Sequence, residues 1–162
     1  MNQPTSIIEL KALSRAFDGR TVLHDLTLSF PKGLTTVVMG PSGCGKSVML
    51  KHIIGLLKPD SGELWFQTHR IDTQSETDLS ALRRRFGMLF QQAALFDSMN
   101  VHDNVAFPLL EAGWPEDRID ARVLEVLSLV GLADTLTKLP AELSGGMRKR
   151  VALARTIATE PD

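Results

Sequence analysis

The sequence predicts an α/β fold, and three consecutive stretches around residue 40 carry this prediction. Residues 34–39 are uncharged and rich in apolar side chains, as in a buried strand. Residues 40–47 follow with the spacing G-x-x-x-x-G-K-[ST], whose glycines let backbone N–H groups approach an anion. Residues 48–57 have helical spacing, and the positive end of such a helix faces the loop. This order predicts a phosphate-binding site, against the alternative of a glycine-rich turn that binds nothing.

The loop residues differ in the chemistry that they bring to a nucleotide and its metal ion. Lys46 is a compact cation suited to the outer phosphates, and the Ser47 hydroxyl is placed to ligate Mg²⁺. The candidate nucleotide-binding residues of this stretch are Gly40, Pro41, Ser42, Gly43, Cys44, Gly45, Lys46, Ser47 and Val48.

Length and composition indicate one globular domain, with room for a subdomain. The 162 residues are 43% hydrophobic and 23% charged, with a net charge of −1, which gives no field to attract nucleic acid. A single cysteine excludes an internal disulfide framework. No secretion signal opens the chain, and its longest membrane-like stretch, residues 86–96, is too short to span. We therefore expect a soluble protein that meets a membrane only through a partner.

Short antiparallel strands are predicted on the N-terminal side of the loop. Residues 7–30 contain apolar runs, with turn sequences at 18–20 and 31–33. Phe17 falls in the first of these loops, where an isolated aromatic is by default a core residue. On the C-terminal side we expect a turn at 59–62, a strand at 63–66, a loop at 67–80, a basic helix at 79–85 and an apolar strand at 86–90.

A helical module is predicted beyond Gln91, the polar residue that closes the strand at 86–90 and is a candidate for a metal or water contact. Residues 113–116 mark a helix start, with Pro115 and with acidic residues in the first turn, and Gly131 is a suitable stop. The apolar residues between them at helical spacing are Ile119, Val123, Val126, Leu127 and Val130.

A second anion site is predicted at residues 143–147, Leu-Ser-Gly-Gly-Met, which precede an amphipathic helix at 148–159. Ser144 is well placed as N-cap, and Gly145 and Gly146 leave bare N–H groups at the helix start. An ordinary N-cap is the alternative for this motif alone. Two anion-binding helix starts in one chain favour a functional site.

These motifs, in this order and spacing, resemble the nucleotide-binding subunit of ABC transporters over the whole chain. The resemblance rests on the loop at 40–47, on Met-Leu-Phe-Gln at 88–91 and on the Leu-Ser-Gly-Gly signature at 143–146. It implies a P-loop NTPase core of the ABC ATPase type, with an N-terminal antiparallel β-subdomain and an inserted α-helical subdomain, incomplete at the C-terminus. The implied boundaries are 1–91 for the core, 92–146 for the helical subdomain and 147–162 for the returning signature helix.

The resemblance also implies roles for individual residues. Phe17 falls where the family places the aromatic that stacks on adenine. Lys46, Gln91 and Ser144 would take part in hydrolysis of ATP, and Ser47 and Gln91 would contact Mg²⁺. Ser144, Gly145 and Gly146 would bind the ATP held by a second copy in a head-to-tail homodimer. An integral membrane permease would place a coupling helix near Ala94, Leu95, Phe96 and Met99, and so hold the protein on the inner face of the cell membrane.

Two departures from the family pattern refine this interpretation. Met147 stands where the signature usually has Gln, and with residues 94–101 it makes the chain look like the ATPase of the Mla type, which drives phospholipid transport for outer-membrane lipid asymmetry. The chain also stops before the family's acidic pair and later histidine, so we expect a fragment that binds ATP weakly and does not turn it over alone.

The sequence also allows other interpretations of the function. The sequence as given is compatible with a nucleotide-binding module without turnover, or with an ABC ATPase for another cargo. A GTPase is disfavoured because neither Asn-Lys-x-Asp nor Asp-x-x-Gly occurs. A DNA-repair or translation ATPase with the same cassette is disfavoured by the modest charge and by the apolar stretch after Gln91.

Overall fold

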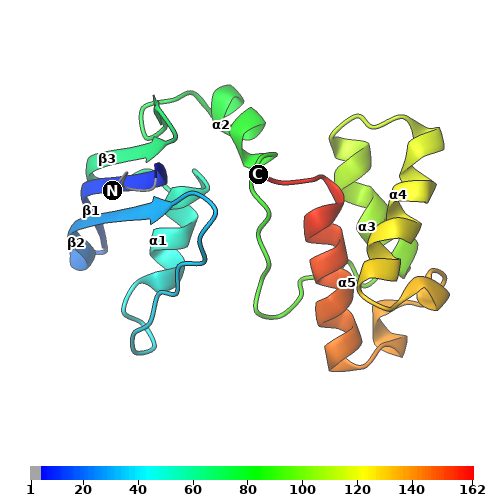
Figure 1. Cartoon of the computed structure of the whole chain (residues 1–162). Helices are drawn as coiled ribbons and strands as arrows, with labels where there is room; N and C mark the ends of the chain where they lie inside the picture. Colours follow the sequence, from blue (N-terminus) through cyan, green and yellow to red (C-terminus); the bar gives the residue numbers. More distant parts are fainter. Residues whose placement is uncertain (1–4) are drawn as a thin grey trace. The chain divides into compact units, whose positions relative to one another are not determined.

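The computed structural model describes residues 5–162, and their contacts divide the chain into two units, Met1–Arg83 and Arg84–Asp162 (Figure 1). Each unit has its own buried side chains and is described by itself.

The described residues of the first unit form a four-stranded antiparallel sheet in the order β2-β1-β3-β4. Its strands are β1 (Ser6–Phe17), β2 (Arg20–Pro31), β3 (Ser61–Phe66) and β4 (His69–Arg70). Asp18 and Gly19 both have positive φ, 48° and 77°, as a tight hairpin turn between β1 and β2 requires. The antiparallel N-terminal strands predicted from the sequence are therefore confirmed.

Two helices accompany this sheet. The helix α1 (Lys46–Ile53) leaves the glycine-rich loop and ends sooner than the predicted 48–57, because Gly55 takes a left-handed conformation with φ 69°. The helix α2 (Glu76–Arg83) begins three residues before the predicted 79–85. Ser75 and the acidic residues of the first turn favour that earlier start, since the Ser75 hydroxyl accepts a hydrogen bond from the Asp78 backbone N–H.

The two apolar strands predicted at 34–39 and 86–90 are wrong for this structure. Neither stretch is a strand, and Met39, Val37 and Leu89 expose 87%, 72% and 50% of their surface. An apolar run of this kind becomes a strand only when another strand pairs with it, and it is buried only when its faces are also covered. The sheet of the described residues is antiparallel throughout and includes neither stretch.

The second unit is helical. Its long helices are α3 (Val101–Glu111), α4 (Glu116–Leu129) and α5 (Gly145–Ala158), with 3₁₀ turns η1 (Ala133–Thr135) and η2 (Pro140–Glu142) between the last two. The predicted helix entry at 113–116 and the stop at Gly131, which has φ 67°, are both confirmed. Among residues 5–162, no helix has both the length and the apolarity needed to cross a bilayer.

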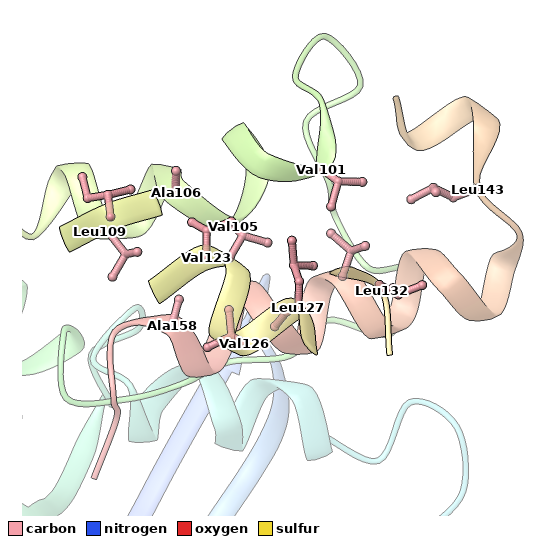
Figure 2. Packing of buried hydrophobic residues seen from close by; sticks show 13 residues of the cluster. Val101, Val105, Ala106, Leu109, Val123, Val126, Leu127, Leu132, Leu143 and Ala158 are labelled. Carbon is pink, nitrogen blue, oxygen red and sulfur yellow. The ribbon is translucent and has the colours of Figure 1, made fainter. Parts of the chain in front are cut away.

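Apolar side chains from all three long helices meet in one cluster (Figure 2). Each fully buried Val or Leu of such a cluster stabilises the fold by roughly 1.5–3 kcal/mol. This core holds the start of α5 in place, because Leu143 is buried directly before the Ser144 N-cap. The buried members are Val101, Val105, Ala106, Leu109, Ile119, Val123, Val126, Leu127, Leu132, Leu143, Val151, Ala154 and Ala158.

Candidate functional site

The loop at residues 40–45 is a compact turn at the start of α1. The Cys44 backbone N–H donates to Pro41 O at 3.4 Å, and the Met49 N–H donates to Gly45 O at 2.8 Å in the first turn of the helix. Gly43 and Gly45 have φ of 81° and 96°, values that residues with a Cβ rarely adopt. The loop therefore has the backbone that a phosphate-binding turn needs.

A side chain at Gly40 or Gly45 would meet close neighbours, and at Gly45 one of them is backbone. A Cβ added to Gly40 would lie 2.8 Å from Cys44 Sγ. A Cβ added to Gly45 would lie 2.9 Å from Leu23 Cδ2 and 3.1 Å from Val22 O, so strand β2 limits the start of α1. Strand β2 thus restricts the position of the loop at Gly45.

The ammonium group of Lys46 lies over the loop. Its Nζ donates to Gly40 O at 2.8 Å and to Pro41 O at 2.7 Å, and lies 3.6 Å from Cys44 Sγ. A cation held over a turn of this kind is suited to an anion with several oxygens. Cys44 and Ser47 are exposed and Val48 is half-buried, so the hydroxyl and the loop are open to solvent.

The metal-binding capacity of the described residues is small. They contain no group of three or more His, Cys, Asp or Glu side chains that could hold a metal ion. Mg²⁺ bound with a nucleotide takes one or two protein ligands and completes its shell with phosphate oxygens and water. Ser47, in the first turn of α1, can supply the protein oxygen.

His52 lies in α1 behind the loop and is fully buried. Burial lowers its pKa, while its Nδ1 lies 2.8 Å from Val48 O. The neutral ring donates that hydrogen bond from Nδ1. His52 is thus a packing residue of the loop helix.

Phe17 is the last residue of β1, not a loop residue as predicted, and it faces Arg20 across the hairpin turn. The ring is half-buried, and the guanidinium carbon of Arg15 lies 4.8 Å from its centroid. Arg15 also donates a hydrogen bond to the Asp60 carboxylate. This ion pair holds the Arg15 guanidinium on one face of the Phe17 ring.

The second unit holds the other predicted site residues. Gln91 is exposed, and it lines a hollow of about 260 Å³ together with Leu89, Phe90 and Lys149. Ser144 is the N-cap of α5 as predicted, and its Oγ accepts from the Met147 N–H at 3.2 Å. Gln91 and the signature thus belong to one unit and the loop at 40–48 to the other.

The glycines of the signature are not required by the packing of their own unit. A Cβ at Gly146 would meet nothing within 4 Å, and one at Gly145 would meet only Arg148 Nη2 at 3.9 Å. Both glycines are exposed in the first turn of α5. Their lack of a side chain leaves the helix start open to an approaching group.

Two residues that the sequence did not single out organise the segment after Gln91. Asn104 is fully buried, and its side chain makes four hydrogen bonds of 2.8–3.0 Å with backbone atoms of Phe96, Met99 and Asn100. Arg155 of α5 donates to the carbonyls of Ala93 and Ala94. A signal for Asn104 was its place three residues after Val101 and four before Pro108, on the apolar face of α3, where a buried amide needs partners.

These contacts shape the predicted permease surface. Ala94 and Phe96 are exposed, while Leu95 and Met99 are half-buried. Beside them lies a hollow of about 350 Å³, lined by Phe86, Gly87, Met88, Phe90, Ala94, Phe96, Phe107, Pro108, Arg155, Thr156 and Thr159.

Comparison with known proteins gives relatives over nearly the whole chain. The chain is 46% identical over 155 residues to a probable ribonucleotide transport ATP-binding protein, mkl, of Mycobacterium leprae, covering 95% of this chain and 45% of the relative. It is 45% identical to the methionine import ATP-binding protein MetN of Symbiobacterium thermophilum, covering 96% and 48%. It is 42% identical to the intermembrane phospholipid transport system ATP-binding protein MlaF of Escherichia coli K12, covering 97% and 59%. The chain therefore spans about half the length of the curated relatives that it matches.

Solved structures agree with these relatives. A dimeric bacterial ABC transporter cassette superimposes with a TM-score of 0.87 at 32% identity, over 95% of this chain and 70% of that one. A second dimeric structure of the same cassette, in a post-hydrolysis state bound to ADP and Pi, gives a TM-score of 0.85 at 31% identity over the same shares of each chain. The structure thus has the predicted fold class, a P-loop ABC ATPase fold with an antiparallel β part and a helical part. The profile of the ABC transporter family matches residues 23–162, and the chain belongs to this family.

Proposed function

We propose that the chain binds and hydrolyses ATP as the nucleotide-binding part of an ABC transporter. The observation that carries this proposal is the loop at 40–45 at the start of α1, where the Lys46 ammonium donates hydrogen bonds to two loop carbonyls. Family membership supports it, since the relatives are named as transport ATP-binding proteins.

The roles of the site residues follow from their chemistry. Lys46 and the N–H groups of residues 40–48 bind the phosphates, and Ser47 gives Mg²⁺ a hydroxyl oxygen. Phe17 offers adenine the ring face away from Arg15. Gln91 contacts the metal ion or its water. We keep 1–91, 92–146 and 147–162 as the proposed functional boundaries.

The signature is proposed to work in a head-to-tail homodimer. Ser144, Gly145 and Gly146 leave an open, positively polarised helix start, and nothing within their own unit fills the space beside Gly146. An ATP held by the partner copy fits this chemistry. Two dimeric structures of one similar cassette support the pairing of two copies.

The exposed surface at Ala94 and Phe96, with Leu95 and Met99, is proposed to receive a coupling helix of a membrane permease. That partner would hold the protein on the inner face of the cell membrane. As cargo we propose phospholipid, because of Met147 in the signature and the likeness to MlaF. Methionine and ribonucleotides, named for other relatives, are the competing cargoes.

A signature variant separates nucleotide binding from turnover. In the full-length protein with its membrane subunit, Ser144→Arg should reduce ATP turnover to background while nucleotide binding to the monomer stays unchanged. The long cation obstructs the helix start that the partner's ATP must approach, and the loop at 40–48 is untouched. Phosphate release and equilibrium binding of a labelled ATP analogue measure the two effects.

Ser128→Arg is the matched control for this experiment, since Ser128 is an exposed serine of the same unit on α4. It should leave both readouts unchanged. Normal turnover by the Ser144→Arg protein would contradict the shared site.

The cargo is tested with the complete transporter in vesicles. Fluorescent phospholipid should move between vesicles in an ATP-dependent manner that Lys46→Ala abolishes. Transport of radiolabelled methionine or ribonucleotide, with no lipid movement, would contradict the phospholipid assignment and leave the ATPase proposal standing.

A further inference from the structure

The backbone that follows Gln91 has an uncommon conformation. Ala93 and Ala94 have φ of 61° and 50°, in the left-handed region that alanine rarely occupies. The Ala93 N–H donates to Phe90 O at 3.1 Å, and the Ala94 N–H donates to Gln92 O at 2.6 Å. Two consecutive residues in this region persist only where surrounding contacts hold them.

Arg155 of α5 supplies such contacts. Its Nη1 donates to Ala94 O at 2.8 Å, and its Nη2 donates to Ala93 O at 3.0 Å. The planar guanidinium presents two parallel N–H groups, and the left-handed turn places two adjacent carbonyls where they can accept. Burial lowers the pKa of Arg155, because the guanidinium loses contact with water. The two carbonyls accept the hydrogen bonds that water would otherwise accept.

Other residues of α5 touch the same stretch of chain. Thr156 Oγ1 lies 3.4 Å from Met88 O, and a Cβ added to Gly87 would lie 2.8 Å from Thr156 Cγ2. Gln91 shares its hollow with Lys149 of α5. The helix that begins at Ser144 therefore contacts the chain on both sides of Gln91.

We propose that Arg155 is a positioning residue: it holds the strained turn at Ala93 and Ala94, and thereby ties the position of Gln91 to the helix that carries the signature. This inference rests on the role proposed above for Gln91 in ATP hydrolysis. Arg155 itself touches neither nucleotide nor metal in this scheme. A shift of α5 would move Gln91 with it, because one rigid helix carries both the signature start and the arginine.

The test replaces Arg155 in the full-length protein with its membrane subunit. Arg155→Met keeps much of the apolar stem but removes both donors, and should lower kcat by about 10- to 100-fold, the effect of misplacing a reacting group by about 1 Å. The affinity for ATP should not change, since the loop at 40–48 belongs to the other unit. Arg155→Lys should lie between, because a point cation cannot serve both carbonyls as a fork does.

Arg150→Met is the matched control. Arg150 lies on the same helix and donates from Nη1 to one carbonyl, Val130 O, at 2.9 Å. Its loss should leave kcat unchanged, although it too removes a guanidinium–carbonyl contact within this unit. An equal fall of kcat in both variants would overturn the proposal, because it would indicate general destabilisation.

A rescue experiment gives a readout that a purely structural role would not move. Glycine adopts positive φ without penalty, so Ala93→Gly with Ala94→Gly should restore part of the kcat of the Arg155→Met protein. The same glycines should change the parent protein little. Failure of the glycines to raise kcat in an Arg155→Met protein with a normal melting temperature would overturn the proposal.

Hydrogen exchange tests whether Arg155 holds the turn at Ala93 and Ala94, without a measurement of ATP turnover. The amides of residues 90–95 should exchange faster in Arg155→Met than in the parent and in Arg150→Met. Unchanged exchange there would overturn the proposal even if kcat fell. Absence of ATP turnover in the parent protein would instead contradict the proposed function, and the exchange comparison would still decide whether Arg155 holds the turn.

Discussion

Replacing Lys46 with alanine is expected to weaken ATP binding by about 100-fold or more, because losing two charge-assisted hydrogen bonds to phosphate costs about 3 kcal/mol or more. The ammonium also donates to Gly40 O and Pro41 O, so its loss removes contacts that shape the loop itself. Isothermal titration calorimetry of the full-length protein with MgATP measures the change, and circular dichroism should show an unchanged fold.

Lys51→Ala is the control for this prediction. Lys51 lies in the last turn of the same helix and is exposed, so its replacement changes net charge equally without touching the loop. It should leave the affinity for ATP within about twofold, since exposed charges at a distance interact weakly in salt. Retained ATP affinity in Lys46→Ala would show that the nucleotide does not lie on this loop.

Replacing Asn104 with leucine should destabilise the helical unit by about 2–4 kcal/mol, the cost of leaving buried polar groups without partners. Leucine fills a similar volume but bonds neither Phe96 N nor Met99 O. The carbonyls of Phe96 and Asn100 retain backbone donors, from Met99 and Asn104. The expected cost therefore comes only from the Phe96 N–H and the Met99 carbonyl.

The two tryptophans make this prediction measurable, because Trp65 belongs to the first unit and Trp114 to the second. A Trp65→Phe background leaves Trp114 fluorescence as the reporter of urea unfolding in the helical unit. Asn100→Ala is the matched control: its side chain accepts one hydrogen bond, from Asp103 N at 2.8 Å, and losing this helix cap should cost about 1 kcal/mol. An Asn104→Leu effect no larger than that of Asn100→Ala would contradict the account.

Several features could be predicted from the sequence because their causes lie within a few residues. The hairpin turn at Asp18 and Gly19, the Ser144 cap and the helix stop at Gly131 all depend on local backbone chemistry. The loop at 40–47 is equally local, since the Lys46 ammonium donates to carbonyls only five and six residues before it. The family, and with it the fold class, could be recognised from motifs of this kind.

The strands expected at 34–39 and 86–90 could not be checked by such reasoning. Apolar composition indicates that a stretch favours burial, but a strand also needs partners that pair with its edges. The described structure gives neither stretch such a partner, and Leu34, with 63% of its surface exposed, shows the result. Pairing depends on chain segments distant in sequence, which a local pattern does not identify.

By itself the sequence determined the chemistry of this protein: a loop for phosphates, a helix start for a second anion, and the family that combines them. Only the tertiary structure decided how the segment after Gln91 is held. Arg155 reaches Ala94 across 61 residues, and no periodicity or turn signal relates the two. Their contact exists because the helical core places α5 beside this segment, and such packing depends on many side chains acting together.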